Sequence, residues 1–177
     1  MDYEFFDALS ADEAQTFLNR FLEVERAELD AMRPSAARDA VVLDFSLSSL
    51  EAALKWMMKQ TRVMRVPVPA DEPESIRQAH AKGLIEFDEF SKSIILRAAY
   101  YLGESFARLP GMRWTIGNGE YMHKNMPVIA GFRSDGELSP LVVVRNKFAR
   151  IVGDGKPESE IDTMIDAWIR HADQQKQ

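Results

Sequence analysis

The residues of this chain best suited to chemistry lie close together in the sequence. Glu104 ends a helical pattern, Trp114 lies in a short apolar run, and Glu120, Tyr121 and His123 follow that run. A carboxylate beside an imidazole can orient the ring, so Glu120 and His123 could together move a proton. We therefore predict ligand-binding residues at these five positions. Because no nucleophile held by a base, oxyanion hole or cofactor signature accompanies them, no catalytic residue is predicted.

The sequence predicts neither a metal site nor a cofactor. The histidines, His80, His123 and His171, are too far apart for helical zinc-ligand spacing, and the chain has no cysteine. Gly117-Asn118-Gly119 lacks the lysine and the glycine spacing of a phosphate-binding loop, and its Asn-Gly pair instead favours a turn. The acids of Glu86-Phe87-Asp88-Glu89 suit the start of a helix better than a metal cluster.

Two elements must position the candidate residues. Apolar residues recur every three or four positions over about 84–108, which predicts a central helix. Two short apolar runs then predict a small antiparallel hairpin of about 112–116 and 127–132. Gly103 weakens the helix by about 1 kcal/mol relative to alanine, so we expect another backbone segment to pack closely against it.

The N-terminal part of the chain predicts two helices. Ser10-Ala11-Asp12-Glu13 has capping-box spacing and begins an acidic helix within 1–33. Pro34 should end that helix, because the residue before a proline avoids the α region. Ser46 or Ser48 caps the second helix. Its predicted buried face consists of Leu47, Leu50, Ala53, Leu54, Met57 and Met58.

Outside residues 139–152, the remaining segments predict one loop and two helices. The prolines of 61–73 predict a loop, and a short helix is expected over 74–81. Ser159 can cap a C-terminal helix that carries apolar residues on one face. Residues 173–177 should fray as a polar tail.

Residues 139–152 fit either a helix or a strand. Ser139 can cap a helix, Pro140 suits its first position, and Gly153 suits a left-handed stop. Leu141–Val144, in contrast, has strong strand propensity. We predict the helix. Together these elements predict an α+β fold, a mostly helical single domain spanning 1–177.

Composition restricts the class of protein. The chain has 177 residues, a hydrophobic fraction of 46% and a net charge of −6, which suit one folded domain. It contains no apolar run long enough to cross a membrane, and its acidic start does not resemble a signal peptide, so a cytoplasmic protein is expected. An acidic balance also argues against nucleic-acid binding.

Charge is spread unevenly along the chain. Residues 1–31 contain nine acids and two arginines, a balance of −7, whereas residues 108–156 contain eight basic and four acidic residues, a balance of +4. These regions could face each other or form solvated surfaces. Alternatively, the acidic helix could recruit a basic partner by electrostatic steering.

The chain resembles a loose set of uncharacterised bacterial domains of unknown function. The resemblance rests on Asp44–Leu50, Ala99–Glu104, Trp114 and Asn125–Ile129, and it covers roughly residues 41–170. Some similar small acidic proteins serve as immunity or adaptor partners. The resemblance therefore implies a bacterial cytosolic setting and supplies no catalytic residue.

Two classes of function remain open. The first is a non-enzymatic protein-interaction domain of immunity-like, adaptor or regulatory type, which binds another protein, for example a basic one, or a second copy of itself. Its motivation is the acidic first helix and the absence of catalytic signatures. The alternative is a small-ligand-binding protein or undescribed enzyme that uses the site around Glu104 and His123.

Overall fold

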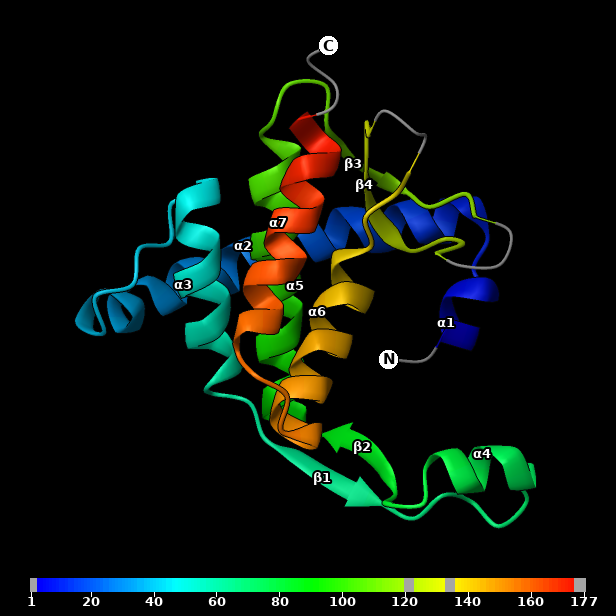
Figure 1. Cartoon of the computed structure of the whole chain (residues 1–177). Coiled ribbons are helices and arrows are strands. Elements are labelled where there is room, and N and C mark those ends of the chain that lie inside the picture. Colours follow the sequence, from blue (N-terminus) through cyan, green and yellow to red (C-terminus); the bar gives the residue numbers. More distant parts are fainter. Residues whose placement is uncertain (1–2, 120–122, 133–135, 174–177) are drawn as a thin grey trace.

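Helix α5 (Glu89–Ala107) runs through the centre of the fold, and the other long helices pack around it (Figure 1). The computed structural model describes residues 3–119, 123–132 and 136–173. Buried residues recur along α5 from Ser91 to Phe106. Helices α2 (Ala11–Arg38), α3 (Leu47–Met58) and α6 (Pro140–Phe148) contact it, and a helix buried on several sides belongs to the core. The predicted central helix is therefore confirmed as the core of the domain.

The start of that helix was predicted too early. Residues Leu84–Phe87 form strand β2, and the Asp88 carboxylate then caps α5 by accepting a 2.7 Å hydrogen bond from the Ser91 amide. Gly83 precedes the strand with φ +87°, a conformation that favours glycine. The apolar positions of 84–87 also fit helical spacing. Only pairing with a distant strand makes them extended.

That partner strand lies inside the predicted loop 61–73, which is a second correction. Strand β1 (Val63–Val66) pairs antiparallel with β2, with Val63 opposite Phe87. Pro67 and Pro69 follow the strand and cannot extend its hydrogen bonding, because proline has no backbone N–H. Helix α4 (Glu74–Ala79) confirms the predicted short helix.

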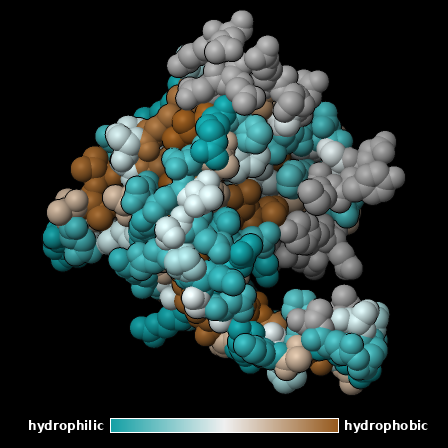
Figure 2. Space-filling model, viewed as in Figure 1, coloured by the Kyte–Doolittle hydropathy of each residue, from teal (hydrophilic) through white to brown (hydrophobic). Residues whose placement is uncertain are grey.

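We call residues 63–87 the arm. Figure 1 shows α4 projecting at the end of the β1–β2 pair, and Figure 2 shows this mostly hydrophilic lobe set off from the body. Strands β1 and β2 contact the segment that follows α6. The base of the arm is thus attached to the body, whereas its tip extends away from it.

The second pair of strands confirms the predicted hairpin. Strand β3 (Arg113–Ile116) pairs antiparallel with β4 (Pro127–Ala130), and Trp114 lies opposite Ile129. Gly103 of α5 packs against this hairpin, but a side chain rather than the expected backbone approaches it. A Cβ at Gly103 would collide with the Trp114 indole ring. The glycine is therefore required by the position of that tryptophan.

Helix α2 was predicted to end before Pro34. This prediction is wrong, because the helix continues to Arg38. The capping box at Ser10 is confirmed, since its side chain accepts from the Glu13 amide and the Glu13 carboxylate accepts from the Ser10 amide. Beyond the proline, Ala36 is buried and its carbonyl accepts a 2.8 Å hydrogen bond from Val41. Burial of this last turn therefore outweighs the conformational restriction at the residue before proline. A separate short helix, α1 (Tyr3–Asp7), precedes α2.

Helix α3 confirms the second predicted helix, and Ser46 caps it. Its side chain accepts a hydrogen bond from the Ser49 amide. All residues of the predicted face are buried except Leu47, which is partly exposed.

The ambiguous segment 139–152 is helical. Helix α6 leads into a π-helix (Ala149–Gly153), and the C-terminal helix α7 (Ser159–Asp173) packs on α3. Two details differ from prediction. Ser139 makes no capping hydrogen bond with its side chain, and the left-handed glycine is Gly155 with φ +67° rather than Gly153.

The described residues form the predicted α+β fold, mostly helical with two small antiparallel strand pairs. Most of the predicted tail, residues 174–177, lies outside the described residues. No helix within the described part combines the length and the apolar composition needed to cross a membrane.

Candidate functional site

The structure brings together two of the predicted site residues, Glu104 and Trp114. The Trp114 indole Nε1 donates a 3.4 Å hydrogen bond to one carboxylate oxygen of Glu104. Arg108, one turn later in α5, donates to the other oxygen at 3.1 Å. Both carboxylate oxygens therefore have a donor, which fixes the orientation of a side chain that remains partly exposed.

Three aromatic rings pack against one another beside this carboxylate. Tyr100 and Trp114 are stacked, with ring centroids 6.5 Å apart and an interplanar angle of 7°. Phe21 of α2 meets the edges or faces of both rings in T-shaped contacts, at 6.3 Å from Tyr100 and 5.7 Å from Trp114. Such offset and T-shaped arrangements are favourable for aromatic pairs. They hold α2, α5 and β3 together at this point.

A groove of about 550 Å³ lies between α2 and α5, and of these three rings its lining includes Tyr100. We call it the α2/α5 groove. Residues of both helices line it: Leu22, Glu23, Arg26, Ala27, Asp30, Tyr100 and Glu104. The spacing of these positions, 23, 26, 27 and 30 on α2 and 100 and 104 on α5, places one face of each helix toward the groove.

Tyr100 is the most unusual residue of this groove. Its side chain is only 4% exposed, yet it lines the groove, and its hydroxyl makes no hydrogen bond with another described residue. Burial raises the pKa of that hydroxyl, and the nearby Glu104 carboxylate contributes to the rise. A hydroxyl that lines a groove and has no protein partner can accept a hydrogen bond from a bound molecule or donate one to it.

The charges of the groove are mixed, with an excess of carboxylates on its lining. Glu23, Asp30 and Glu104 oppose Arg26 alone. Asp30 is paired with Arg33 at 2.7 Å, just as Glu104 is paired with Arg108. Glu23 makes no ion pair with any described residue, so its carboxylate is available to a bound cation.

Of the other predicted site residues, the structure describes only His123, which is not part of the groove lining. Glu120 and Tyr121 lie outside the described residues. His123 lies in the β3–β4 connection with φ +70°, and its carbonyl accepts a hydrogen bond from Met126. Burial lowers the pKa of the His123 imidazole, whereas the Glu137 carboxylate opposes that shift. Within the described part of the chain, no hydrogen bond joins His123 to Glu104.

Sequence analysis missed the contribution of α2 to this site. The helical spacing of Glu23, Arg26, Ala27 and Asp30 was readable, but it does not say which neighbour a polar helix face covers. Tyr100 was assigned only to the core helix. Its place at the edge of the core, rather than within it, depends on the packing of α2.

No family profile, curated protein or solved structure matches this chain. The resemblance to bacterial domains of unknown function therefore stays a prediction. Among the described residues, no three histidine, aspartate or glutamate side chains are grouped to hold a metal ion. The groove offers hydrogen-bonding groups, charged side chains and one aromatic ring to a bound molecule.

Proposed function

We propose that this chain is a protein-interaction domain that binds a basic segment of a partner protein in the α2/α5 groove. The observation that carries the proposal is the Tyr100 side chain, which is mostly buried but lines a concave site, and whose hydroxyl makes no hydrogen bond with a described residue. The setting we propose is a bacterial cytosol, with an immunity-like, adaptor or regulatory role.

A lysine or arginine side chain matches the chemistry of the groove. Its charged group could donate hydrogen bonds to the Tyr100 oxygen and to the Glu23 carboxylate, which has no described ion-pair partner. Its aliphatic stem could pack against Leu22 and Ala27, as long basic side chains do on apolar surface. The −7 balance of residues 1–31 would steer such a segment toward α2.

The test is binding of a fluorescent arginine- and lysine-rich peptide, measured by anisotropy beside an acidic peptide of the same length. We expect saturable binding of the basic peptide only, weakening as salt rises. Tyr100→Phe should reduce its affinity about fivefold or more, because one hydrogen bond to a charged donor is lost. The double variant Glu23→Gln/Asp30→Asn should reduce it further.

The matched control removes the same charge elsewhere. Asp71→Asn/Glu72→Gln changes two exposed carboxylates of the arm. Equal loss of affinity in this control and in Glu23→Gln/Asp30→Asn would mean that the peptide senses net charge only. That result, or an unaltered affinity in Tyr100→Phe, would contradict the proposal.

A second candidate function is small-ligand binding in the same groove, with or without catalysis. The volume of about 550 Å³ favours it, since small-molecule sites commonly have this size. Native mass spectrometry of the purified protein would detect a co-purifying small molecule. If the small molecule no longer co-purifies with Tyr100→Phe and the original chain does not bind the basic peptide, small-ligand binding is supported over binding of a basic protein segment.

Self-association is the third possibility, because the basic partner could be a second copy of the chain. Light scattering over a range of protein concentrations separates it from the first two. A monomer at all concentrations would exclude it, while a dimer that dissociates in Glu23→Gln/Asp30→Asn would favour it.

A further inference from the structure

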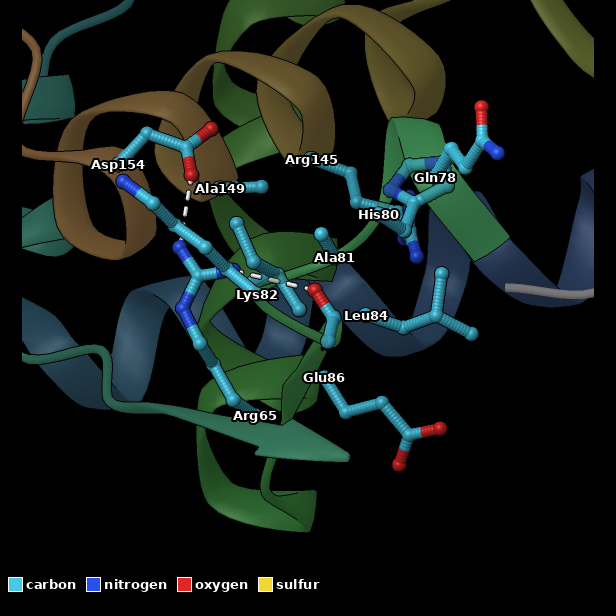
Figure 3. Close-up of a pocket in the computed structure, with 12 residues that line it drawn as sticks. Arg65, Gln78, His80, Ala81, Lys82, Leu84, Glu86, Arg145, Ala149 and Asp154 are labelled. Carbon is cyan, nitrogen blue, oxygen red and sulfur yellow. Dashed lines mark hydrogen bonds and ion pairs between the residues drawn. The ribbon is translucent and has the colours of Figure 1, made fainter. Parts of the chain in front are cut away.

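A second cavity, of about 660 Å³, lies where the arm meets the body (Figure 3). We call it the arm cavity. The arm contributes Arg65, Gln78 and residues 80–86 to its lining, and the body contributes Arg145, Ala149 and Asp154. None of these residues belongs to the α2/α5 groove, so the two sites can be tested independently.

Two irregular backbone segments shape this cavity. At Gly83, with φ +87°, a Cβ would lie 2.7 Å from the Val66 carbonyl oxygen. At Gly153, which ends the π-helix, a Cβ would lie 2.5 Å from Cδ1 of Ile85. Gly83 therefore permits a close contact within the arm, beside Val66, whereas Gly153 permits Ile85 of the arm to approach the body. π-Helical segments are rare and occur frequently at functional sites.

The cavity carries an excess of positive charge, unlike the chain as a whole. Arg65, Lys82 and Arg145 oppose Glu86 and Asp154, a balance of +1 with His80 neutral. The whole chain has a net charge of −6. A local excess of cations in a concave site attracts anions, because low-dielectric walls concentrate the field.

These three cations differ in whether their side chains make hydrogen bonds and ion pairs within the protein. Arg65 is already held in place, since it donates to the carbonyls of Gly83 and Gly153 and to the Asp154 carboxylate at 2.8–3.1 Å. The side chains of Lys82 and Arg145 make no hydrogen bond or ion pair with another described residue. Arg65 therefore serves as a structural link between arm and body, and it occupies the acid that could otherwise neutralise Lys82.

Figure 3 shows Arg145 extending from α6 toward His80 and Gln78 of the arm. A guanidinium, an ammonium, an imidazole and an amide are thus distributed around one cavity. Leu84, Ile85 and Ala149 add apolar surface to the same cavity. Polar groups that bind an anion therefore stand beside surface that suits an uncharged organic moiety.

We propose that the arm cavity binds a phosphorylated organic small molecule, whose negative charge is attracted by the cations Lys82 and Arg145 of the lining. Guanidinium and ammonium groups bind phosphate oxygens through short, charge-assisted hydrogen bonds. The volume of about 660 Å³ exceeds what inorganic phosphate fills, so the organic part lies against the apolar wall.

Isothermal titration of the full chain with AMP, glucose 6-phosphate and inorganic phosphate tests this proposal. We expect saturable binding of at least one organic phosphate, tighter than that of inorganic phosphate. Lys82→Ala and Arg145→Ala should each weaken it about tenfold or more, the loss expected for one charged hydrogen bond. Glu86→Gln should tighten it severalfold, because that variant removes an opposing charge from the cavity.

Matched controls change exposed cations elsewhere. Lys124→Ala and Arg170→Ala should leave the affinity unchanged, since neither residue lines the cavity. If Arg145→Ala unfolds, Arg145→Gln replaces it, with the thermal midpoint recorded for every variant. Absence of saturable binding by both organic phosphates, equal losses in cavity and control variants, or inorganic phosphate binding as tightly as both would overturn the proposal.

Discussion

The α2/α5 groove and the arm cavity are built in opposite ways. Regular helices form the groove, and the residues that line it recur at helical intervals on α2 and α5. Irregular segments form the arm cavity, namely a two-stranded arm and a π-helix. Their lining charges also differ in sign. The comparison teaches that a chain with a net charge of −6 can still present a cationic site where a separate segment folds back on the body.

The largest expected effect concerns Gly103→Ala, which would disrupt the groove side of this comparison. The added Cβ would collide with the Trp114 ring and lie 3.0 Å from Pro140. We expect a loss of about 3 kcal/mol in the free energy of unfolding, although alanine restores about 1 kcal/mol of helix propensity. Urea denaturation followed by circular dichroism measures it, and phosphate binding in the arm cavity should survive in the folded fraction.

A double variant identifies the cause of that loss. Trp114→Ala removes the ring that the new Cβ meets, so Gly103→Ala should cost much less when it is introduced into Trp114→Ala. Additive losses in the double variant would contradict the steric explanation.

The next effect is pH dependence arising from Glu25, a buried residue of α2 that is 7% exposed. Burial raises the pKa of its carboxyl from 4.5 to about 7, despite the nearby Arg97 guanidinium. The folded state therefore binds this proton more tightly than the unfolded state. Its contribution to stability is fully present below pH 4.5 and is lost as pH rises toward and through about 7.

Glu25→Gln should abolish this pH dependence. Above about pH 7 the variant should exceed the original chain in stability by about 2 kcal/mol, because an amide carries no buried charge. Chemical denaturation across the pH range measures the difference. Glu23→Gln, an exposed change two positions earlier in α2, is the control and should leave the pH dependence of unfolding in place.

The regular part of the molecule could be predicted from sequence because its signals are local. The capping box at Ser10 and the apolar spacing of α5 each depend on residues within a few positions of one another. The same holds for the strands around Trp114. Even here, the reach of that indole over Gly103 could not be predicted, since it depends on how the hairpin is placed against the helix.

The irregular part could not be predicted because its decisive contacts are distant in sequence. Leu84–Phe87 fits helical and strand spacing equally, and pairing with Val63–Val66 decides between them. Gly153 was expected to end a helix in the left-handed region. Its actual role depends on Ile85, which lies far away in the chain. The candidate site followed the same rule, since Glu104 and Trp114, which are hydrogen-bonded, were named from the sequence, whereas the α2 residues that line the groove with Glu104 were not.

The smallest expected effect, from Gly153→Ala, tests the other side of the comparison. The new Cβ would lie 2.5 Å from Cδ1 of Ile85, the end of a flexible side chain that can move aside. We therefore expect a loss of only about 1 kcal/mol in the free energy of unfolding, measured by urea denaturation. Movement of Ile85 would shift β2 away from the π-helix, so organic phosphate binding should weaken while peptide binding in the α2/α5 groove stays unchanged. Ile85→Val in the same chain should restore part of the stability, because it removes the Cδ1 methyl group that the new Cβ meets. Loss of peptide binding in Gly153→Ala would show that the two regions are coupled and that the contrast drawn between them is wrong.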